Sequence, residues 1–498
     1  MTLESEVTEA IPASTARMYN VFPVAADDSS VTLATFDLVD PRISDEMLFT
    51  LSKEVKFVFA REKDVMDRIA QYYGDANESV ADMIKSLGEG MTDDEALAAG
   101  ANANDIASME SMANSSAIIK FVNLVLYQGV VDHAADIHVE PFENDFKIRY
   151  RVDGALYEMK APDVKMAPAI ISRIKILANL NIAERRVPQD GRIALTVAGR
   201  PVDLRVSCLP TAHGESVVMR ILDQTTTSLD LENVGLPEDV YEQITMDIEK
   251  PNGIFIVTGP TGSGKTTTLY SILRRINTVD LKLLTAEEPV EYDMDGIVQV
   301  PINYDTGNTF PKVLRAFLRQ DPDVMMIGEI RDLETAEIAI QAALTGHLVF
   351  STLHTNDAAG AVMRFVDMNV PPYMVASTLE AVLAQRLLRT CCKECKEGYE
   401  PDDEALDRIK LSREEIGGRP FYFGKGCKVC NGTGYKGRKA IFEYLRVGNA
   451  IRELINKRAP TLIIRDKARE LGMRTMREDG VRAILDGYTT MDEVLRYT

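Results

Sequence analysis

The chain has 498 residues, 45% of them apolar and 27% charged, values that are typical of globular proteins and exclude a fibrous or disordered chain. This length favours about three to four domains. The net charge of −20 argues against a dedicated nucleic-acid binder, which needs a basic surface, and no run of about 18 uncharged apolar residues predicts a transmembrane helix.

The acidic charge is concentrated in the first part of the chain. Residues 1–115 carry 8 Lys and Arg against 22 Asp and Glu, so they hold −14 of the net charge and leave −6 for the other 383 residues. We expect an acidic N-terminal module, residues 1–85, separate from a nearly balanced body, although a merely solvated surface explains the charge equally well. The beginning, MTLESEVTEA, has no apolar core, so we expect no secretory signal and a reducing cytoplasm around the cysteines.

The N-terminal module is predicted to be a small α/β unit. Apolar residues alternate over 31–35 and again over 55–59, as they do in half-buried strands. Residues 62–73 have helical spacing, and Gly74 is a plausible C-terminal stop. The following residues, 86–112, are small, acidic and rich in Gly, Ala and Asn, which is typical of a linker.

A second N-terminal domain, mixed α+β, is predicted over 113–225. Apolar residues after Ser115 fit the buried face of a helix. Two hairpins are expected, turning at Asp153-Gly154 and at Ala198-Gly199, with strands at 136–140, 146–152, 192–195 and 202–205. Residues 226–245 are interpreted as a connector.

A phosphate-binding loop follows the short buried strand 254–257. The residues GPTGSGKT have the pattern G-x4-G-K-T between a strand and a helix, the context that the motif requires. Glycines let backbone N–H groups turn inward around a phosphate, Lys265 can reach the β- and γ-phosphates, and the Thr266 hydroxyl can bind Mg²⁺. The loop predicts a nucleoside triphosphate without separating ATP from GTP; its candidate ligands are Gly259, Pro260, Thr261, Gly262, Ser263, Gly264, Lys265, Thr266 and Thr267.

Acidic residues stand where two further strands end. The strand 324–327 leads to Glu329, a candidate partner of Mg²⁺ or of the attacking water. The strand 281–285 delivers Glu287, Glu288 and Glu291, three carboxylates that repel one another unless a cation lies between them. Only one of the three needs to act as a base.

A fourth strand, 346–355, carries His354, which is expected to sense the γ-phosphate and shares its strand parity with Thr352. From residue 253 to 389, short apolar strand patterns alternate with helical ones, which predicts a parallel sheet covered by helices. We therefore assign 246–390 to the catalytic domain and expect a helical C-terminal region over 436–498.

Four cysteines between these segments are predicted to bind a structural metal ion. Two C-x2-C pairs, Cys392 with Cys395 and Cys427 with Cys430, are typical of tetrahedral Zn²⁺ with four thiolates. Cys391 is an alternative to Cys392, although the spacing favours Cys392. The module spans 391–435, and the distant Cys208 is interpreted as a core thiol.

The segments GPTGSGKTTT, EEPVEY, DPDVMMIGEIRD and GHLVFSTLHTNDA resemble the four boxes of the secretion traffic ATPases, the motors of type II secretion and type IV pilus assembly. ADIHVEP, RVPQDGRI, DLRVS and the ending GYTTMDEVLRYT are similar as well, so the resemblance covers residues 113–498. It implies an α/β fold: a RecA-like P-loop ATPase core, a preceding PAS-like α+β domain, a small N-terminal α/β domain and a four-cysteine zinc insert.

The resemblance also implies roles for single residues. Glu291 matches the family's catalytic base, Glu329 its Mg²⁺-associated acid and His354 its His-box histidine. Arg205 in DLRVS and Arg220 in VVMRIL match arginines that face the phosphates from the second N-terminal domain. That domain is expected to move relative to the phosphate-loop domain, which would convert hydrolysis into motion.

The implied function is a cytoplasmic motor that hydrolyses ATP, with Mg²⁺ and a structural Zn²⁺, to power assembly of a pseudopilus or pilus. The resemblance implies a hexamer that inner-membrane platform and docking proteins hold at the membrane periphery through its N-terminal module. It implies no nucleic-acid partner. A non-hydrolysing docking scaffold is the alternative, and the presence of Lys265, Glu291 and Glu329 argues against it. A nucleic-acid translocase is disfavoured by the charge, and no repeated Arg-Leu-Gly-type motif supports cyclic-dinucleotide binding. The sequence alone does not separate secretion from pilus assembly.

Overall fold

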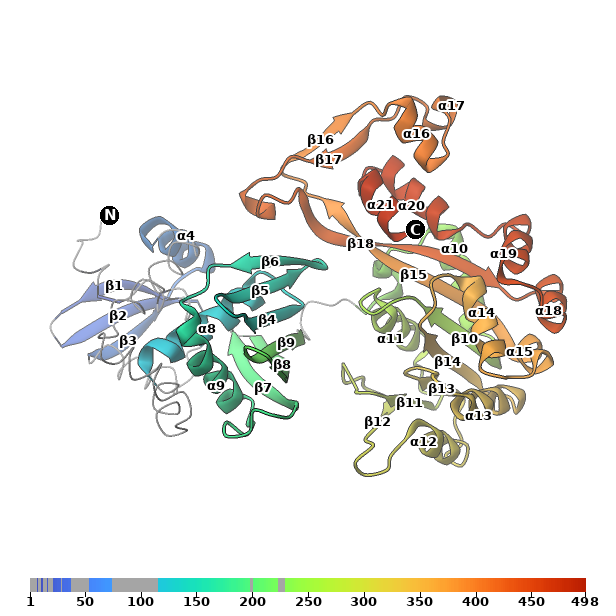
Figure 1. Cartoon of the computed structure of the whole chain (residues 1–498), viewed down its shortest axis with the longest axis horizontal. Coiled ribbons are helices and arrows are strands. Elements are labelled where there is room, and N and C mark those ends of the chain that lie inside the picture. The colour runs from blue at the N-terminus through green and yellow to red at the C-terminus, as the bar shows by residue number, and fades with distance from the viewer. Residues whose placement is uncertain are drawn as a thin grey trace. The chain divides into compact units, whose positions relative to one another are not determined.

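The computed structural model describes residues 7, 10–11, 16, 21–27, 29–36, 53–73, 115–197, 200–222 and 229–498 (Figure 1). The chain divides into two compact units, residues 1–226 and residues 227–498. The expected linker at 86–112, the stop at Gly74 and the turn at Ala198-Gly199 lie outside the described residues.

The first described part of unit 1 is a three-stranded sheet with the strand order β1-β2-β3. Its strands are β1 (Phe22–Ala26), β2 (Ser30–Thr35) and β3 (Glu54–Phe59), and helix α4 (Glu62–Tyr73) follows them. Val65 and Ile69 of α4 are buried beside Phe22 and Ala34. The two predicted strands and the predicted helix are therefore confirmed.

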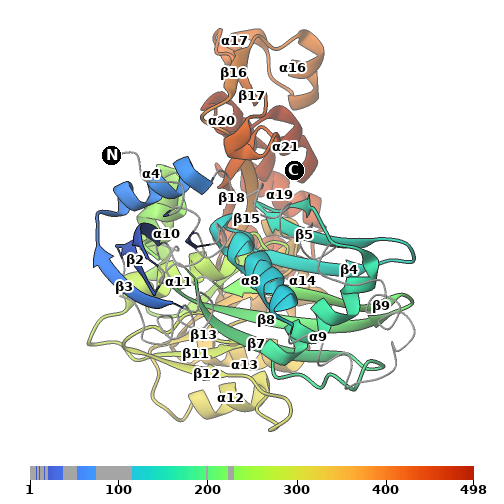
Figure 2. The same cartoon turned by 90° about the vertical axis from the view of Figure 1, so that its left-hand side faces the viewer.

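A six-stranded antiparallel sheet with the order β6-β5-β4-β9-β8-β7 forms the second described part of unit 1. Figure 2 shows α8 and α9 lying over this sheet, and residues of both helices share its apolar core. The predicted α+β pattern and the turn at Asp153-Gly154 are confirmed. The elements are α8 (Ser116–Val131), β4 (Asp136–Pro141), β5 (Phe146–Val152), β6 (Ala155–Met159), η1 (Val164–Met166), α9 (Ala167–Leu177), β7 (Gln189–Val197), β8 (Arg200–Thr211) and β9 (Gly214–Leu222).

Unit 2 is built on a seven-stranded sheet with the order β12-β11-β13-β14-β10-β15-β18. The strands from β12 to β15 pair in parallel, as predicted, and β18 closes one edge antiparallel to β15. The strands are β10 (Gly253–Thr258), β11 (Leu283–Glu287), β12 (Ile297–Pro301), β13 (Val324–Ile327), β14 (Leu348–Leu353), β15 (Leu379–Cys391) and β18 (Tyr435–Arg446).

Helices cover both faces of this sheet because side chains alternate along its strands. In β10, Phe255 and Val257 join the core with η2, α10 and α11, whereas Ile254 and Ile256 face the core that includes α12 to α15 and the C-terminal helices. The covering elements are η2 (Leu231–Val234), α10 (Glu238–Ile248), α11 (Lys265–Ile276), α12 (Phe310–Phe317), α13 (Leu333–Leu344), α14 (Ala358–Asp367), α15 (Pro372–Thr378), α18 (Asn449–Asn456), α19 (Thr461–Glu470), α20 (Met476–Leu485) and α21 (Met491–Tyr497).

Two predicted boundaries are wrong. Residues 226–245 are not merely a connector, because Val240 and Ile244 of α10 are buried in the core of unit 2. The region 436–498 does not begin with a helix, because β18 pairs with β15 from Ala381 opposite Arg446 to Cys391 opposite Tyr435. Helices occupy only the rest of that region, from α18 onward.

The cysteine-bearing insert carries a small hairpin of β16 (Lys396–Tyr399) and β17 (Phe421–Gly424), with α16 (Asp403–Ile409), α17 (Arg413–Ile416) and η3 (Lys428–Cys430) (Figure 1). Leu406, Ile416 and Phe421 belong to the same core cluster as residues of α20 and α21. The insert is therefore packed on the C-terminal helices. None of the helices described here is long and apolar enough to cross a membrane.

Candidate functional site

The phosphate loop joins the C-terminal end of β10 to the N-terminus of α11, as the motif predicts. Gly264 caps α11 with a φ of 88°, a left-handed conformation that glycine adopts without strain. A Cβ at Gly259 would lie 2.5 Å from the backbone oxygen of Gln385, so only glycine fits this close approach. The loop therefore brings its backbone to the N-terminus of a helix, where an anion is favoured.

Lys265 is buried at the start of α11 and folds back over its own loop. Its Nζ donates to the carbonyl oxygens of Gly259 at 2.9 Å and Pro260 at 3.0 Å. Burial lowers the pKa of Lys265 to about 8, although the nearby Glu329 carboxylate opposes this effect. A poorly solvated ammonium group beside a phosphate loop gains strongly from an anionic partner.

Glu329 and His354 lie together beside Lys265, as expected from the ends of β13 and β14. The Glu329 carboxylate accepts a hydrogen bond from Arg331 Nη2 at 2.6 Å and lies 3.4 Å from His354 Nε2. Its side chain is only 15% exposed, whereas that of His354 is 49% exposed. Burial and the positive charge of Lys265 lower the pKa of His354, which favours a neutral imidazole.

Thr352 does not share this site with His354. Its Oγ1 donates to the Gly328 carbonyl at 2.6 Å and ties β14 to the end of β13. Thr258, at the end of β10, instead links the His354 segment to the phosphate loop: its hydroxyl accepts from the Thr355 backbone N–H at 3.0 Å. Strand-to-strand hydrogen bonds thus hold the two loops side by side.

The carboxylates of Glu287 and Glu288 each have a partner from the protein itself. Glu287 is buried and accepts from Tyr270, from Thr285 Oγ1 at 2.5 Å and from Gln299 Nε2 at 3.1 Å. Glu288 accepts from Tyr304 at 3.3 Å and lies 3.7 Å from Arg331.

Glu291, the third of these carboxylates, is half-buried, and its backbone N–H donates to the hydroxyl of Tyr270 at 3.2 Å. Tyr270 therefore contacts both Glu287 and Glu291. Sequence reasoning missed this tyrosine; its one signal is a polar aromatic residue on the apolar face of the helix after the phosphate loop.

Arg205 and Arg220 lie in unit 1, directly opposite each other on β8 and β9. Arg192 of β7 is opposite Arg205, so three guanidinium groups follow one another across neighbouring strands. Arg220 Nε donates to Asp136 at 2.9 Å, yet the Arg220 side chain is 56% exposed. The pairing brings the two predicted arginines together and adds Arg192, which sequence reasoning missed because it stands in a separate motif.

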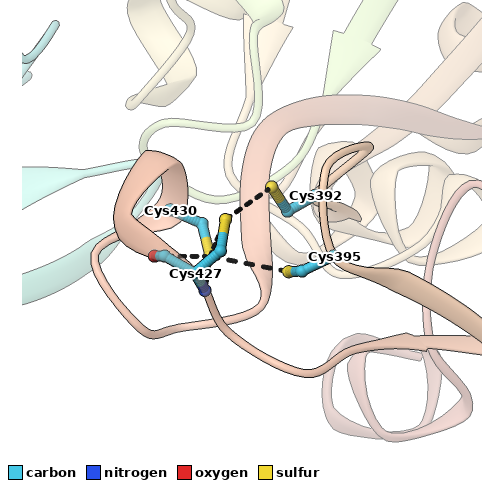
Figure 3. A group of neighbouring side chains, drawn as sticks. All are labelled: Cys392, Cys395, Cys427 and Cys430. Atoms are coloured by element: carbon cyan, nitrogen blue, oxygen red, sulfur yellow. Dashed lines mark hydrogen bonds between the residues drawn. The ribbon is translucent and has the colours of Figure 1, made fainter.

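The four predicted cysteines converge on one point (Figure 3). All four Sγ atoms lie within 4.8 Å of one another, and the separations are 3.8 Å for Cys392–Cys427, 3.8 Å for Cys395–Cys430 and 3.7 Å for Cys427–Cys430. The cluster can hold a metal ion. Cys391 is not in it, because its Sγ faces the Tyr422 carbonyl at 3.8 Å.

Backbone N–H groups surround the sulfur atoms of the cluster. The N–H of Gly426 points to Cys395 Sγ at 3.3 Å, and those of Cys427 and Gly434 point to Cys430 Sγ at 3.2 and 3.3 Å. Such donors stabilise thiolates, the form in which cysteine binds metals. Cys208 lies apart in the core of unit 1, where burial raises its pKa to about 11, as expected for a core thiol.

Comparison with known proteins places this geometry in a family. Residues 111–496 match the model described as type II/IV secretion system protein, and residues 1–79 match the MshEN domain. Type II secretion system protein E of Xanthomonas campestris pv. campestris is 44% identical over 482 residues, which are 97% of this chain and 83% of that protein. The type IV pilus assembly ATPase PilB of Myxococcus xanthus is 41% identical over 498 residues, 100% of this chain and 87% of that protein.

Solved structures agree on the fold. The pilus retraction motor PilT with bound ADP superposes with a TM-score of 0.51 at 25% identity and covers 75% of this chain and 96% of its own. The ATPase DotB of Legionella pneumophila has a TM-score of 0.55 at 22% identity and covers 75% of this chain and 94% of its own. With its phosphate loop, its acidic and histidine boxes and these relatives, the chain belongs to the type II/IV secretion system protein family, as an ATPase of type II secretion or type IV pilus assembly.

Proposed function

We propose that the chain binds Mg²⁺ and ATP at the phosphate loop and hydrolyses ATP to power assembly of a pseudopilus or pilus. The observation that supports this most is the grouping of Lys265, Glu329 and His354 at the ends of three neighbouring strands. A hydroxyl on Thr266 and a carboxylate on Glu329 are hard oxygen ligands of the kind that Mg²⁺ prefers. When bound there, the ion would neutralise charge on the phosphates.

Each residue has a distinct task in the proposed reaction. The backbone N–H groups of residues 259–267 and the ammonium of Lys265 hold the β- and γ-phosphates. Glu291 takes the proton of the attacking water or orients that water. His354 has a lowered pKa that favours the neutral imidazole, and it lies next to Glu329. It is proposed to sense whether the γ-phosphate is present at the carboxyl ends of β13 and β14.

Arg205 and Arg220 are proposed as fingers that reach the transferring phosphoryl group from the second N-terminal domain. The row of guanidinium groups across β7, β8 and β9 supports this, because the Arg220 side chain is 56% exposed although it pairs with Asp136. Arginine fingers stabilise transition-state charge by about 10³–10⁵ in rate in the best cases. An arginine finger that reaches the site of a neighbouring subunit requires the subunits to form a ring. We propose that this ring is a hexamer.

The N-terminal module is proposed to dock on inner-membrane platform and docking proteins, so that the motor works in the cytoplasm at the membrane periphery. Residues 1–115, which include this module and the linker that follows it, carry a net charge of −14, and this supports a separate interaction module. A non-hydrolysing scaffold would not need Lys265 or the Glu329–His354 pair.

Arg220→Ala is expected to lower ATP turnover, and the loss should be larger in the oligomer than in isolated chains. The change removes a charge that another subunit's site would use. Phosphate release measured over a range of protein concentrations tests this, with Lys147→Ala, an ion-paired lysine of strand β5 in the same sheet, as the control. A loss by the same factor at every concentration would mean that the finger acts within its own chain.

We propose Zn²⁺ as the metal of the four-cysteine cluster. Four thiolates at about 2.3 Å in a tetrahedron around Zn²⁺ lie about 3.8 Å apart, and the separations of 3.7 and 3.8 Å between the cysteine sulfur atoms fit this value. Four protein ligands leave no open position, so the ion would be structural.

Protein purified without added zinc is expected to contain about one Zn per chain. Replacing both Cys427 and Cys430 with Ser should remove the metal and expose residues 391–435 to limited proteolysis, whereas Cys391→Ser should keep it. Metal analysis by mass spectrometry measures the content. A folded wild-type chain without metal would exclude the site.

A further inference from the structure

A polar side chain of strand β15 contacts both the phosphate loop and helix α11. Gln385 is only 1% exposed and follows the apolar residues 381–384 of the strand. Its Nε2 donates to the backbone carbonyl of Ser263 at 2.7 Å, and its Oε1 accepts from the hydroxyl of Thr268 at 2.9 Å. The amide thus connects the loop to the first turn of α11.

The same residue touches the loop at two glycines. A Cβ at Gly259 would lie 2.5 Å from the Gln385 backbone oxygen, and one at Gly264 would lie 3.1 Å from Gln385 Nε2. Gly259, Ser263 and Gly264, which span the loop, therefore all lie against Gln385. Gln385 lies at the level where β10 ends, because Thr258 is opposite Ala384 in the parallel pair.

The chemistry of the two contacts requires an amide. The Ser263 carbonyl needs a donor, and the Thr268 hydroxyl needs an acceptor. A glutamate would place an oxygen against the Ser263 carbonyl, and a methionine of similar length would leave both buried groups without a partner. A buried polar group left unpaired is costly, so the loop would move to regain a partner.

We propose that Gln385 is a positioning residue of the phosphate loop: it holds the loop in the shape that binds phosphate, without touching the nucleotide. This inference rests on the proposed nucleotide binding at the loop. Backbone N–H groups must converge on the phosphates, and a misplacement of about 1 Å can cost about 10²-fold in rate. The effect should therefore appear in nucleotide affinity and turnover and not only in folding.

Two variants remove the contact from opposite sides. Gln385→Met removes both hydrogen bonds, and Thr268→Val removes the hydroxyl while keeping the side-chain shape. Each is expected to weaken Mg·ADP binding by about tenfold and to slow phosphate release, and the double variant should be no worse than Gln385→Met alone, because both changes break one unit. Thr268→Ser keeps the hydroxyl and should bind within about twofold of the wild type.

The matched control is Ser271→Ala, one helical turn further along α11. Ser271 is also fully buried, but its hydroxyl donates to the Thr267 carbonyl of its own helix. The Ser271→Ala variant should bind Mg·ADP with the affinity of the wild type. Calorimetry on the full chain measures affinity, and thermal unfolding without nucleotide separates a folding defect from a binding defect.

The outcomes distinguish the inference from the proposed site. Wild-type affinity in folded Gln385→Met or Thr268→Val, or an equal loss in Ser271→Ala, would overturn the positioning role. If Gln385→Met does not fold, Thr268→Val is compared with Thr268→Ser. Weak Mg·ADP binding in Thr268→Val together with normal binding in Thr268→Ser would support the positioning role, because the two variants differ in the hydroxyl that contacts Gln385. If Lys265→Ala also binds Mg·ADP normally, the nucleotide site itself is wrong.

Discussion

Lys265→Ala is expected to reduce ATP turnover by at least about 10³-fold, which would be measured as loss of steady-state phosphate release. The ammonium is buried beside the loop and donates to the carbonyls of Gly259 and Pro260, so it already lies next to the loop that is proposed to bind the phosphates. Burial that lowers its pKa to about 8 also means that water screens its charge weakly. Removing this charge leaves the β- and γ-phosphates without their main cationic partner.

A lysine far from the loop serves as the control. Lys312 of α12 is exposed and donates to the Gly307 carbonyl at 3.1 Å. Lys312→Ala should leave turnover within about twofold of the wild type, as expected for a surface substitution. Unchanged phosphate release in Lys265→Ala would end the interpretation of this chain as a motor.

The parts of the site that could be predicted from the sequence are those with a local signal. The phosphate loop reads as glycines, lysine and threonine within eight consecutive residues, and the strand before it is a short apolar run. Glu329 and His354 each stand within two residues of the end of such a run. Parallel strands bring their carboxyl ends to one edge of the sheet. These residues can therefore be placed together without knowing which strands are neighbours.

The missed parts depend on contacts between distant segments. β18 pairs with β15 across the whole cysteine insert, and its residues YKGRKAIFEYLR have no local turn that joins it to a partner. Tyr270 and Gln299 satisfy Glu287 from 17 and 12 residues away. Such partners appear only once the chain has folded, so the sequence alone does not show that Glu287 is paired within the protein.

The contacts of Glu287 and Glu291 predict opposite outcomes for the same substitution at two nearby positions. Glu287→Gln should mainly destabilise the fold, by about 1–3 kcal/mol. Tyr270, Thr285 and Gln299 all donate hydrogen bonds to the buried carboxylate. An amide would place its own N–H donors against one of these donors. Thermal unfolding without nucleotide measures this loss. An unchanged unfolding temperature would show that the carboxylate is not held as described.

Glu291→Gln should leave folding and ATP affinity nearly unchanged and slow hydrolysis by about 10²–10⁴. The glutamine keeps the size and hydrogen bonding of the half-buried side chain, and the backbone contact to Tyr270 does not involve the carboxylate. A base acts only after the nucleotide has bound, so its loss changes turnover and leaves binding intact. ATP affinity and turnover measured on both variants separate the two roles. Wild-type turnover in Glu291→Gln would place the base elsewhere, and Glu329 would be tested next, because Glu287 is buried and its carboxylate already accepts three hydrogen bonds.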